Sequence, residues 1–232
     1  MIRKFSSSIV AVALRYLFRK RIALSIFVCM LLSPALAVAA PIYGQNIVLN
    51  GGFESGNYID NGRGFMELDA GTSYLDNWTI TSGSVDWIEG YWTPQEPIKS
   101  IDINGSNGGT LLQDLQTEAG FTYGVNFWLA GNPAGGDSLK NLAVELYSPY
   151  NQLLYSFDTS GYTLGDMGWT EFNFFFTATG DSTTLVFRSL ESGAYGPALD
   201  NVSVAATPEP ATLFLLGSGL FGLGLIRRRR RV

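Results

Sequence analysis

The sequence has 232 residues and a formal net charge of −5, and it contains no histidine and a single cysteine, Cys29. This composition excludes Ser-His-Asp and Cys-His catalysis and histidine-ligated zinc. Between residues 41 and 206 there are only four basic residues against nineteen acidic ones. Such an acidic segment argues against nucleic-acid binding, because that affinity depends on Lys and Arg.

The first 40 residues have the pattern of an export signal. Basic residues up to Arg21 precede an apolar run at 22–32, and Ala-Val-Ala at 37–39 offers the small residues that signal peptidase accepts. We predict cleavage after the last alanine of this triplet or after the next one, which removes Cys29 as well. The alternative is an uncleaved anchor.

Residues 41–206 are predicted to form one all-β domain. Runs such as "TYGVNFWLA" and "TEFNFFFTA" are rich in aromatic and β-branched residues, and Gly/Asn clusters such as "NGSNGG" separate them. Phe172, Phe174 and Phe176 alternate along one run, which predicts a strand with one buried face. Short strands repeated at this spacing predict an antiparallel sandwich or barrel.

Longer motifs give this domain a family likeness. "IVLNGGFESG" near its start and "LVFRSLESGAYGPALDNVSV" near its end resemble the choice-of-anchor C type of bacterial surface domain. That type is similar in turn to the galactose-binding-like jelly rolls of many carbohydrate-binding modules. The resemblance covers about residues 46–205 and implies an all-β, antiparallel jelly-roll β-sandwich at the cell surface, and sugar binding follows from it by analogy.

A metal site is predicted where the two ends of the domain meet. In jelly rolls of this appearance the first and last strands lie side by side, which brings Glu54 close to Asp200. The two carboxylates are then expected to share a structural Ca²⁺, with backbone carbonyls near Gly51 and Gly52 and water completing six to eight oxygen ligands. Alternatively, Glu54 is a solvated turn residue and Asp200 caps or starts a strand.

An aromatic cluster is the second candidate site. Trp87, Tyr91 and Trp92 lie within "DWIEGYWTP" and are predicted to bind a ligand by stacking on the apolar face of a sugar ring. The alternative is burial in the core, where most tryptophans lie. No catalytic residue is predicted, because nineteen acidic residues give many chance pairs and the spacing singles out none of them for glycoside hydrolysis.

The C-terminal segment 207–232 reads "TPEPATLFLLGSGLFGLGLIRRRRRV". A Pro-Glu-Pro triplet comes first, then an apolar stretch, then a basic cluster. The triplet is Pro208, Glu209 and Pro210, and the basic cluster is Arg227, Arg228, Arg229, Arg230 and Arg231. A helix over 211–226 would be about 24 Å long against a hydrocarbon core of about 30 Å. We therefore predict a short membrane helix whose arginines stay on the cytoplasmic side, with the acidic domain facing outward.

This order of three parts resembles the PEP-CTERM sorting signal of exported Gram-negative bacterial proteins. The resemblance implies processing by exosortase, a membrane protease-transpeptidase of organisms that make exopolysaccharide. We expect a protein that is anchored transiently in the inner membrane and then reaches the cell surface or the extracellular matrix. There its sandwich is expected to bind carbohydrate or exopolysaccharide. The alternatives are a structural matrix protein without a discrete ligand, and a carboxylate-based glycosidase.

Overall fold

The computed structural model describes residues 40–208 and 217–218. The chain divides into two units, and the second begins at Pro41. The described residues hold the following strands: β1 (Phe65–Asp69), β2 (Thr79–Ser82), β3 (Ser84–Ile88), β4 (Ser100–Asp102), β5 (Thr110–Gln116), β6 (Thr122–Gly131), β7 (Leu139–Tyr147), β8 (Asn151–Asp158), β9 (Thr170–Thr177), β10 (Ser182–Ser189) and β11 (Pro197–Ala206).

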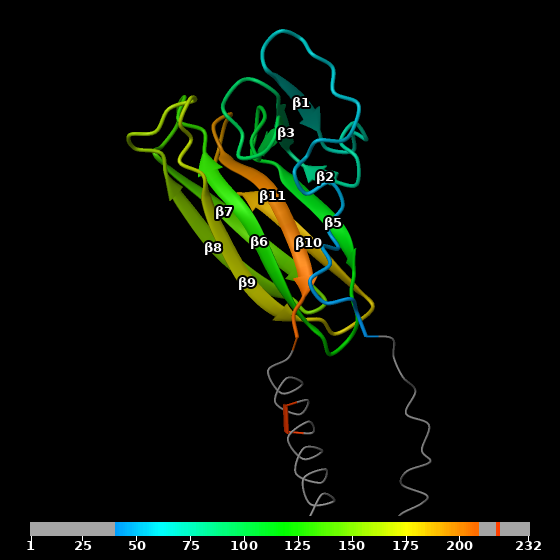
Figure 1. The fold of residues 1–232 in the computed structure, drawn as a ribbon. Helices are drawn as coiled ribbons and strands as arrows, with labels where there is room; N and C mark the ends of the chain where they lie inside the picture. The colour runs from blue at the N-terminus through cyan, green and yellow to red at the C-terminus, as the bar shows by residue number, and fades with distance from the viewer. Residues whose placement is uncertain (1–39, 209–216, 219–232) are drawn as a thin grey trace, which may run out of the picture. The chain divides into compact units, whose positions relative to one another are not determined.

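The strands form two sheets that enclose one hydrophobic core (Figure 1). A six-stranded sheet has the order β1-β3-β4-β11-β6-β9, and a five-stranded sheet has the order β2-β5-β10-β7-β8. Neighbouring strands are antiparallel in both sheets. The arrangement is a jelly-roll β-sandwich, which confirms the predicted all-β class.

The predicted alternation along 170–177 is seen in β9. Phe172 and Phe174 pack against the core and Phe176 is 5% exposed, whereas Phe175 points outward and is 62% exposed. Burying one face of a strand in this way requires a period of two residues. The phenylalanines of β9 therefore supply core packing, as the sequence indicated.

The beginning and the end of the domain lie side by side. The Gly44 amide donates to the Ala206 carbonyl at 3.0 Å, and the Ile47 amide donates to the Val204 carbonyl at 2.8 Å. Further along, Val202 donates to the Gly51 carbonyl at 2.9 Å. A side chain at Gly51 would collide with the Val202 carbonyl oxygen, so glycine is required for this close approach.

The two chain ends carry predictions that this structure does not reach. The predicted export signal, the predicted apolar helix apart from residues 217–218, and the arginine cluster lie outside the described residues. Within residues 40–208 and 217–218, no helix has the length and apolar character needed to cross a membrane.

Candidate functional site

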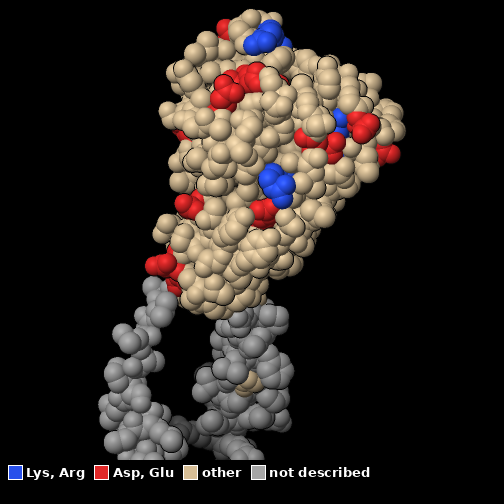
Figure 2. Space-filling model, turned by 180° about the vertical axis from the view of Figure 1, so that it is seen from behind, with Lys and Arg blue, Asp and Glu red and all other residues tan. Residues whose placement is uncertain are grey.

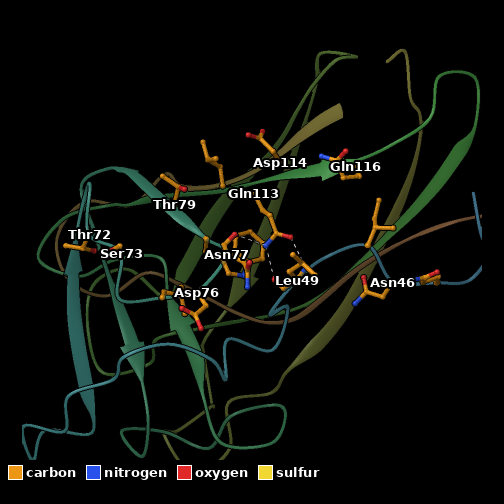
Figure 3. A pocket seen from close by; sticks show the side chains of 15 residues that line it. Asn46, Leu49, Thr72, Ser73, Asp76, Asn77, Thr79, Gln113, Asp114 and Gln116 are labelled. Atoms are coloured by element: carbon orange, nitrogen blue, oxygen red, sulfur yellow. Dashed lines mark hydrogen bonds between the residues drawn. The ribbon is translucent and has the colours of Figure 1, made fainter. Parts of the chain in front are cut away.

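A pocket of about 700 Å³ with a mixed polar and apolar lining lies at one edge of the five-stranded sheet. Strands β2 and β5, the segment 45–49 and the loop 72–78 line it, and it is open to solvent (Figure 3). Its wall combines hydroxyl, amide and carboxylate groups with the apolar side chains of Leu49 and Leu112. We call this cavity the β2–β5 pocket.

Gln113 holds the wall of the pocket together. This residue of β5 is 6% exposed and donates from its side-chain amide to the Leu49 carbonyl at 2.8 Å and the Asn77 carbonyl at 3.0 Å. Its side-chain oxygen accepts the Leu49 amide at 2.8 Å. One side chain thus joins the N-terminal segment, the 72–78 loop and the sheet, so the pocket is formed before any ligand arrives.

Asn50 completes this arrangement behind the pocket. Its side-chain amide donates to the carbonyls of Ser55 and Asp76, both at 2.9 Å, and its backbone carbonyl accepts the Trp78 indole N–H at 2.9 Å. Asn50 has a φ of 55° and Asn77 a φ of 66°. Asparagine tolerates this left-handed conformation better than most residues, which explains why it is found at both turns.

The outer face of the same sheet continues from the pocket toward β7 and β8. Asp114 on β5, Thr184 on β10 and Tyr147 on β7 are partners in one cross-strand row. Two interstrand spacings therefore separate Asp114 from Tyr147, a distance of about 10 Å. Tyr147, Tyr150 and Leu154 are 46%, 67% and 67% exposed. We call these three side chains the β7–β8 platform.

Glu145 anchors the platform from below. It is 6% exposed, and its carboxylate accepts hydrogen bonds from Arg188, from the Gln152 side-chain amide at 2.9 Å and from the Tyr147 hydroxyl at 2.9 Å. Burial raises the pKa of Glu145, but the bonds from Arg188, Gln152 and Tyr147 outweigh it and leave the pKa below its usual value. The ionised carboxylate therefore fixes the Tyr147 ring in place.

The predicted aromatic cluster does not form such a surface. Trp87 is 0% exposed and Trp92 is 3% exposed. Their indole N–H groups donate to the Phe53 carbonyl and to the Ser100 hydroxyl, each at 2.8 Å. A ring without an exposed face cannot stack on a sugar, which corrects the prediction for both tryptophans. Tyr91 is half-buried.

The Glu54 and Asp200 carboxylates both accept backbone hydrogen bonds from the segment 95–99, and we call this arrangement the amide clamp. Glu54 accepts the amides of Ile98 at 3.0 Å and Lys99 at 2.9 Å. Asp200 accepts the amides of 95, 96 and 201. Burial raises the pKa of Asp200 to about 7, and the Glu54 charge adds to this effect while the amide bonds oppose it.

Carboxylate oxygens that would have to bind a calcium ion already accept these backbone amides. Calcium takes six to eight oxygen ligands. Among the residues that the structure describes, no group of three or more Asp, Glu, Cys or His side chains is placed to hold a metal. The clamp on residues 95–99 gives Glu54 and Asp200 a role without an ion, and a shared Ca²⁺ remains a prediction.

The sequence did not predict an acidic pair on the six-stranded sheet, in which Asp102 is buried and Asp86 is half-buried. Asp86 on β3 faces Asp102 on β4. Asp102 is 0% exposed, and burial raises its pKa to about 8 despite hydrogen bonds from Asn132, Asn104 and Gly196. Burial raises the pKa of Asp86 to about 7. Because Asp102 is out of reach of any substrate, its role is to hold the loops that cover this sheet.

The sorting motif begins immediately after the fold ends. Strand β11 ends at Ala206, and Thr207 still donates from its backbone to the Thr122 carbonyl at 2.8 Å. Pro208 is exposed, and Glu209 and Pro210 lie outside the described residues. The triplet therefore starts one residue after the last hydrogen-bonded position of the domain.

The described domain is thus a jelly-roll β-sandwich with an open pocket at the edge of its five-stranded sheet. The chain belongs to the family described as "Protein of unknown function (DUF642)", whose model matches residues 46–205. Residues 206–231 match the PEP-CTERM protein-sorting motif. The motif indicates export to the cell surface, whereas the likeness to choice-of-anchor C domains is not confirmed.

Individual proteins resemble this chain over the same region. Halomucin from Haloquadratum walsbyi is 31% identical over 169 residues, which are 71% of this chain and 2% of Halomucin. TmCBM61 in complex with β-1,4-galactotriose has a TM-score of 0.45 and 12% identity, covering 70% of this chain and 99% of TmCBM61. The arabinose-bound α-L-arabinofuranosidase MgGH51 has a TM-score of 0.48 and 12% identity, and the match covers 71% of this chain and 27% of MgGH51. At this identity the structural likeness concerns the fold alone.

Proposed function

We propose that this protein is an exported, exosortase-processed surface or matrix protein whose β-sandwich binds carbohydrate through the outer face of the five-stranded sheet. The β2–β5 pocket is the specific part of this site. The β7–β8 platform extends it along the polymer.

The observation that carries the proposal is the joining of pocket and platform on one sheet face. Sugars combine hydroxyl groups with apolar C–H faces, so they bind where exposed aromatic rings adjoin fixed hydrogen-bonding groups. The pocket offers amide, hydroxyl and carboxylate groups around Leu49 and Leu112. The platform offers Tyr147 and Tyr150, whose ring centroids are 5.5 Å apart.

The sorting motif supports the location. The expected sequence is export, removal of residues 1–40 by signal peptidase, retention by the segment after Pro210 and processing by exosortase. The orientation follows from the arginine cluster, which stays on the cytoplasmic side of the membrane. The acidic domain then meets the polysaccharide outside the cell.

Two assays with full-length protein test the binding proposal: a glycan array, and affinity electrophoresis through gels that contain exopolysaccharide. Y147A and Y150A should each reduce the retention, because stacking of a sugar ring on an exposed aromatic ring is lost. F175A is the matched control, since Phe175 is 62% exposed but lies on the other sheet. Equal loss in all three variants, or no retention of the wild type, would count against this site.

Two alternatives give different results in the same assays. A purely structural matrix protein shows no retention on any glycan while it still reaches the surface. A glycosidase releases new reducing ends from the retained polymer. The binding proposal predicts retention without release.

A further inference from the structure

The cations of the domain are few, and the structure shows what each one contacts. Residues 40–208 and 217–218 contain only Arg63, Lys99, Lys140 and Arg188. Lys99 forms a salt bridge with Glu89 at 3.0 Å. Arg188 forms its ion pair with Glu145 beneath the platform.

The other two cations, Lys140 and Arg63, do not line the pocket either. Lys140 is 0% exposed, and its ammonium donates to the carbonyls of Gly135 at 2.7 Å and Tyr195 at 2.9 Å. Arg63 lies over the Phe65 ring at 4.9 Å, in the segment that leads into β1 of the six-stranded sheet. Figure 2 shows few basic side chains on the face in view, and each of these lies near acidic side chains. Other acidic side chains on this face have no basic side chain beside them.

The pocket itself is acidic. Asp76 comes from the 72–78 loop and Asp114 from β5, so the two acidic residues line the cavity from different walls (Figure 3). Both side chains are exposed, and none of the four cations lines the cavity. The Thr184 hydroxyl on β10 donates to one oxygen of the Asp114 carboxylate and so orients it, while the Asp114 side chain stays exposed.

We propose that the β2–β5 pocket binds a glycan that carries free ammonium groups, which means a polymer of amino sugars whose nitrogens are not acetylated. This inference rests on the proposed carbohydrate-binding function and names its substrate class. No Lys or Arg lines the pocket to pair with a uronate or sulfated polymer, and the acidic surface repels such a polymer. An ammonium group gains from Asp76 and Asp114 and from the negative potential around the cavity.

A matched pair of oligosaccharides tests the substrate class. Full-length protein in detergent is titrated with the glucosamine hexamer and with the N-acetylglucosamine hexamer, which share one backbone and differ in the acetyl group. Oligoguluronate in EDTA serves as the anionic probe. We expect the glucosamine hexamer to bind at least tenfold more tightly than the acetylated one at low salt. Because exposed charges are screened within about 8 Å at physiological ionic strength, this preference should shrink as salt is added.

Variants locate the effect in the pocket. D76N and D114N should each weaken binding of the glucosamine hexamer about twofold to fivefold more than binding of the acetylated hexamer, which is the range of an exposed ion pair. E171Q removes the same charge from an exposed position on β9 of the other sheet and should change neither titration.

The outcomes separate the two proposals. Equal affinity for both hexamers, or binding of oligoguluronate, overturns the amino-sugar inference and leaves carbohydrate binding intact. An E171Q effect as large as that of D76N overturns the assignment to the pocket, because overall charge then explains the preference. Binding of none of the three probes, together with no retention on the glycan array, overturns the proposed function as well.

Discussion

Replacing Gln113 with alanine tests whether one side chain holds the pocket wall. The substitution removes three hydrogen bonds to Leu49 and Asn77. At about 1 kcal/mol for each bond, the free energy of unfolding should fall by about 3 kcal/mol. For a domain of this size, that corresponds to a Tm lower by about 6 to 12 °C. Thermal unfolding followed by circular dichroism measures it, and glycan affinity should fall in parallel.

Two further variants make the Gln113 result decisive. Q116A truncates the same residue type three positions along β5, where the side chain is exposed, and should change stability by no more than about 0.5 kcal/mol. Q113E keeps the shape but places an oxygen where an amide now faces the carbonyls of Leu49 and Asn77, so it should destabilise at neutral pH. If the Q113A protein has the same Tm as the Q116A protein, the role assigned to Gln113 is refuted.

The remaining predictions concern pH, calcium and the chain end. Asp86, Asp102 and Asp200 have pKa values raised to about 7, 8 and 7, so the folded state binds more protons than the unfolded state above pH 4. Stability in EDTA, measured by urea titration, should therefore fall as pH rises from 5 to 9. Burial lowers the pKa of Lys140, so Lys140 opposes this trend where its ammonium loses its proton. If Glu54 and Asp200 share Ca²⁺, EDTA should lower the Tm of the wild type but not that of E54Q; an unchanged wild-type Tm would leave only the amide clamp. A protein ending at Thr207 should retain the wild-type Tm but fail to reach the surface, and loss of folding would show that the tail belongs to the structure.

The sequence predicted those features that depend on local pattern. The alternating phenylalanines of β9 indicated a strand with one buried face, and the structure confirms it. The motifs at the two ends of the domain indicated adjacent end segments, and the bond from Val202 to Gly51 shows them side by side. In both cases the signal lies in residues that are close in sequence or in a recognisable pair of motifs.

The burial of Trp92 could not be read from alternation. Alternation distinguishes the two faces of a strand but does not say whether loops cover the outer one. Here the outer face of the six-stranded sheet is also covered, since Ile88 is 2% exposed and Ser100 is 0% exposed. Trp92 lies in the loop that follows β3 and bonds Ser100 on this covered face.

The pocket escaped prediction for a different reason. Gln113 and Leu49 are 64 residues apart, and nothing in either local sequence announces their contact. Tyr147 and Tyr150 flank the turn between β7 and β8, so a Ser-Pro turn with an aromatic on each side was the one available signal. Its meaning depended on knowing that Glu145 lies on the same outer face and bonds Tyr147.

Segment 44–49 links the pocket to the sorting end of the domain. Its first part is bonded to β11 at Val204 and Ala206, and its last part is bonded to Gln113 in the pocket wall. A ligand that contacts the preformed pocket wall should add to the stability of this segment, and because the segment also pairs with β11, it should add to the stability of the strand that ends just before Pro208. If the pocket binds glycan as proposed, binding is thus expected to increase the stability of β11 against local unfolding beside the sorting motif. The coupling follows from one short segment making both sets of hydrogen bonds.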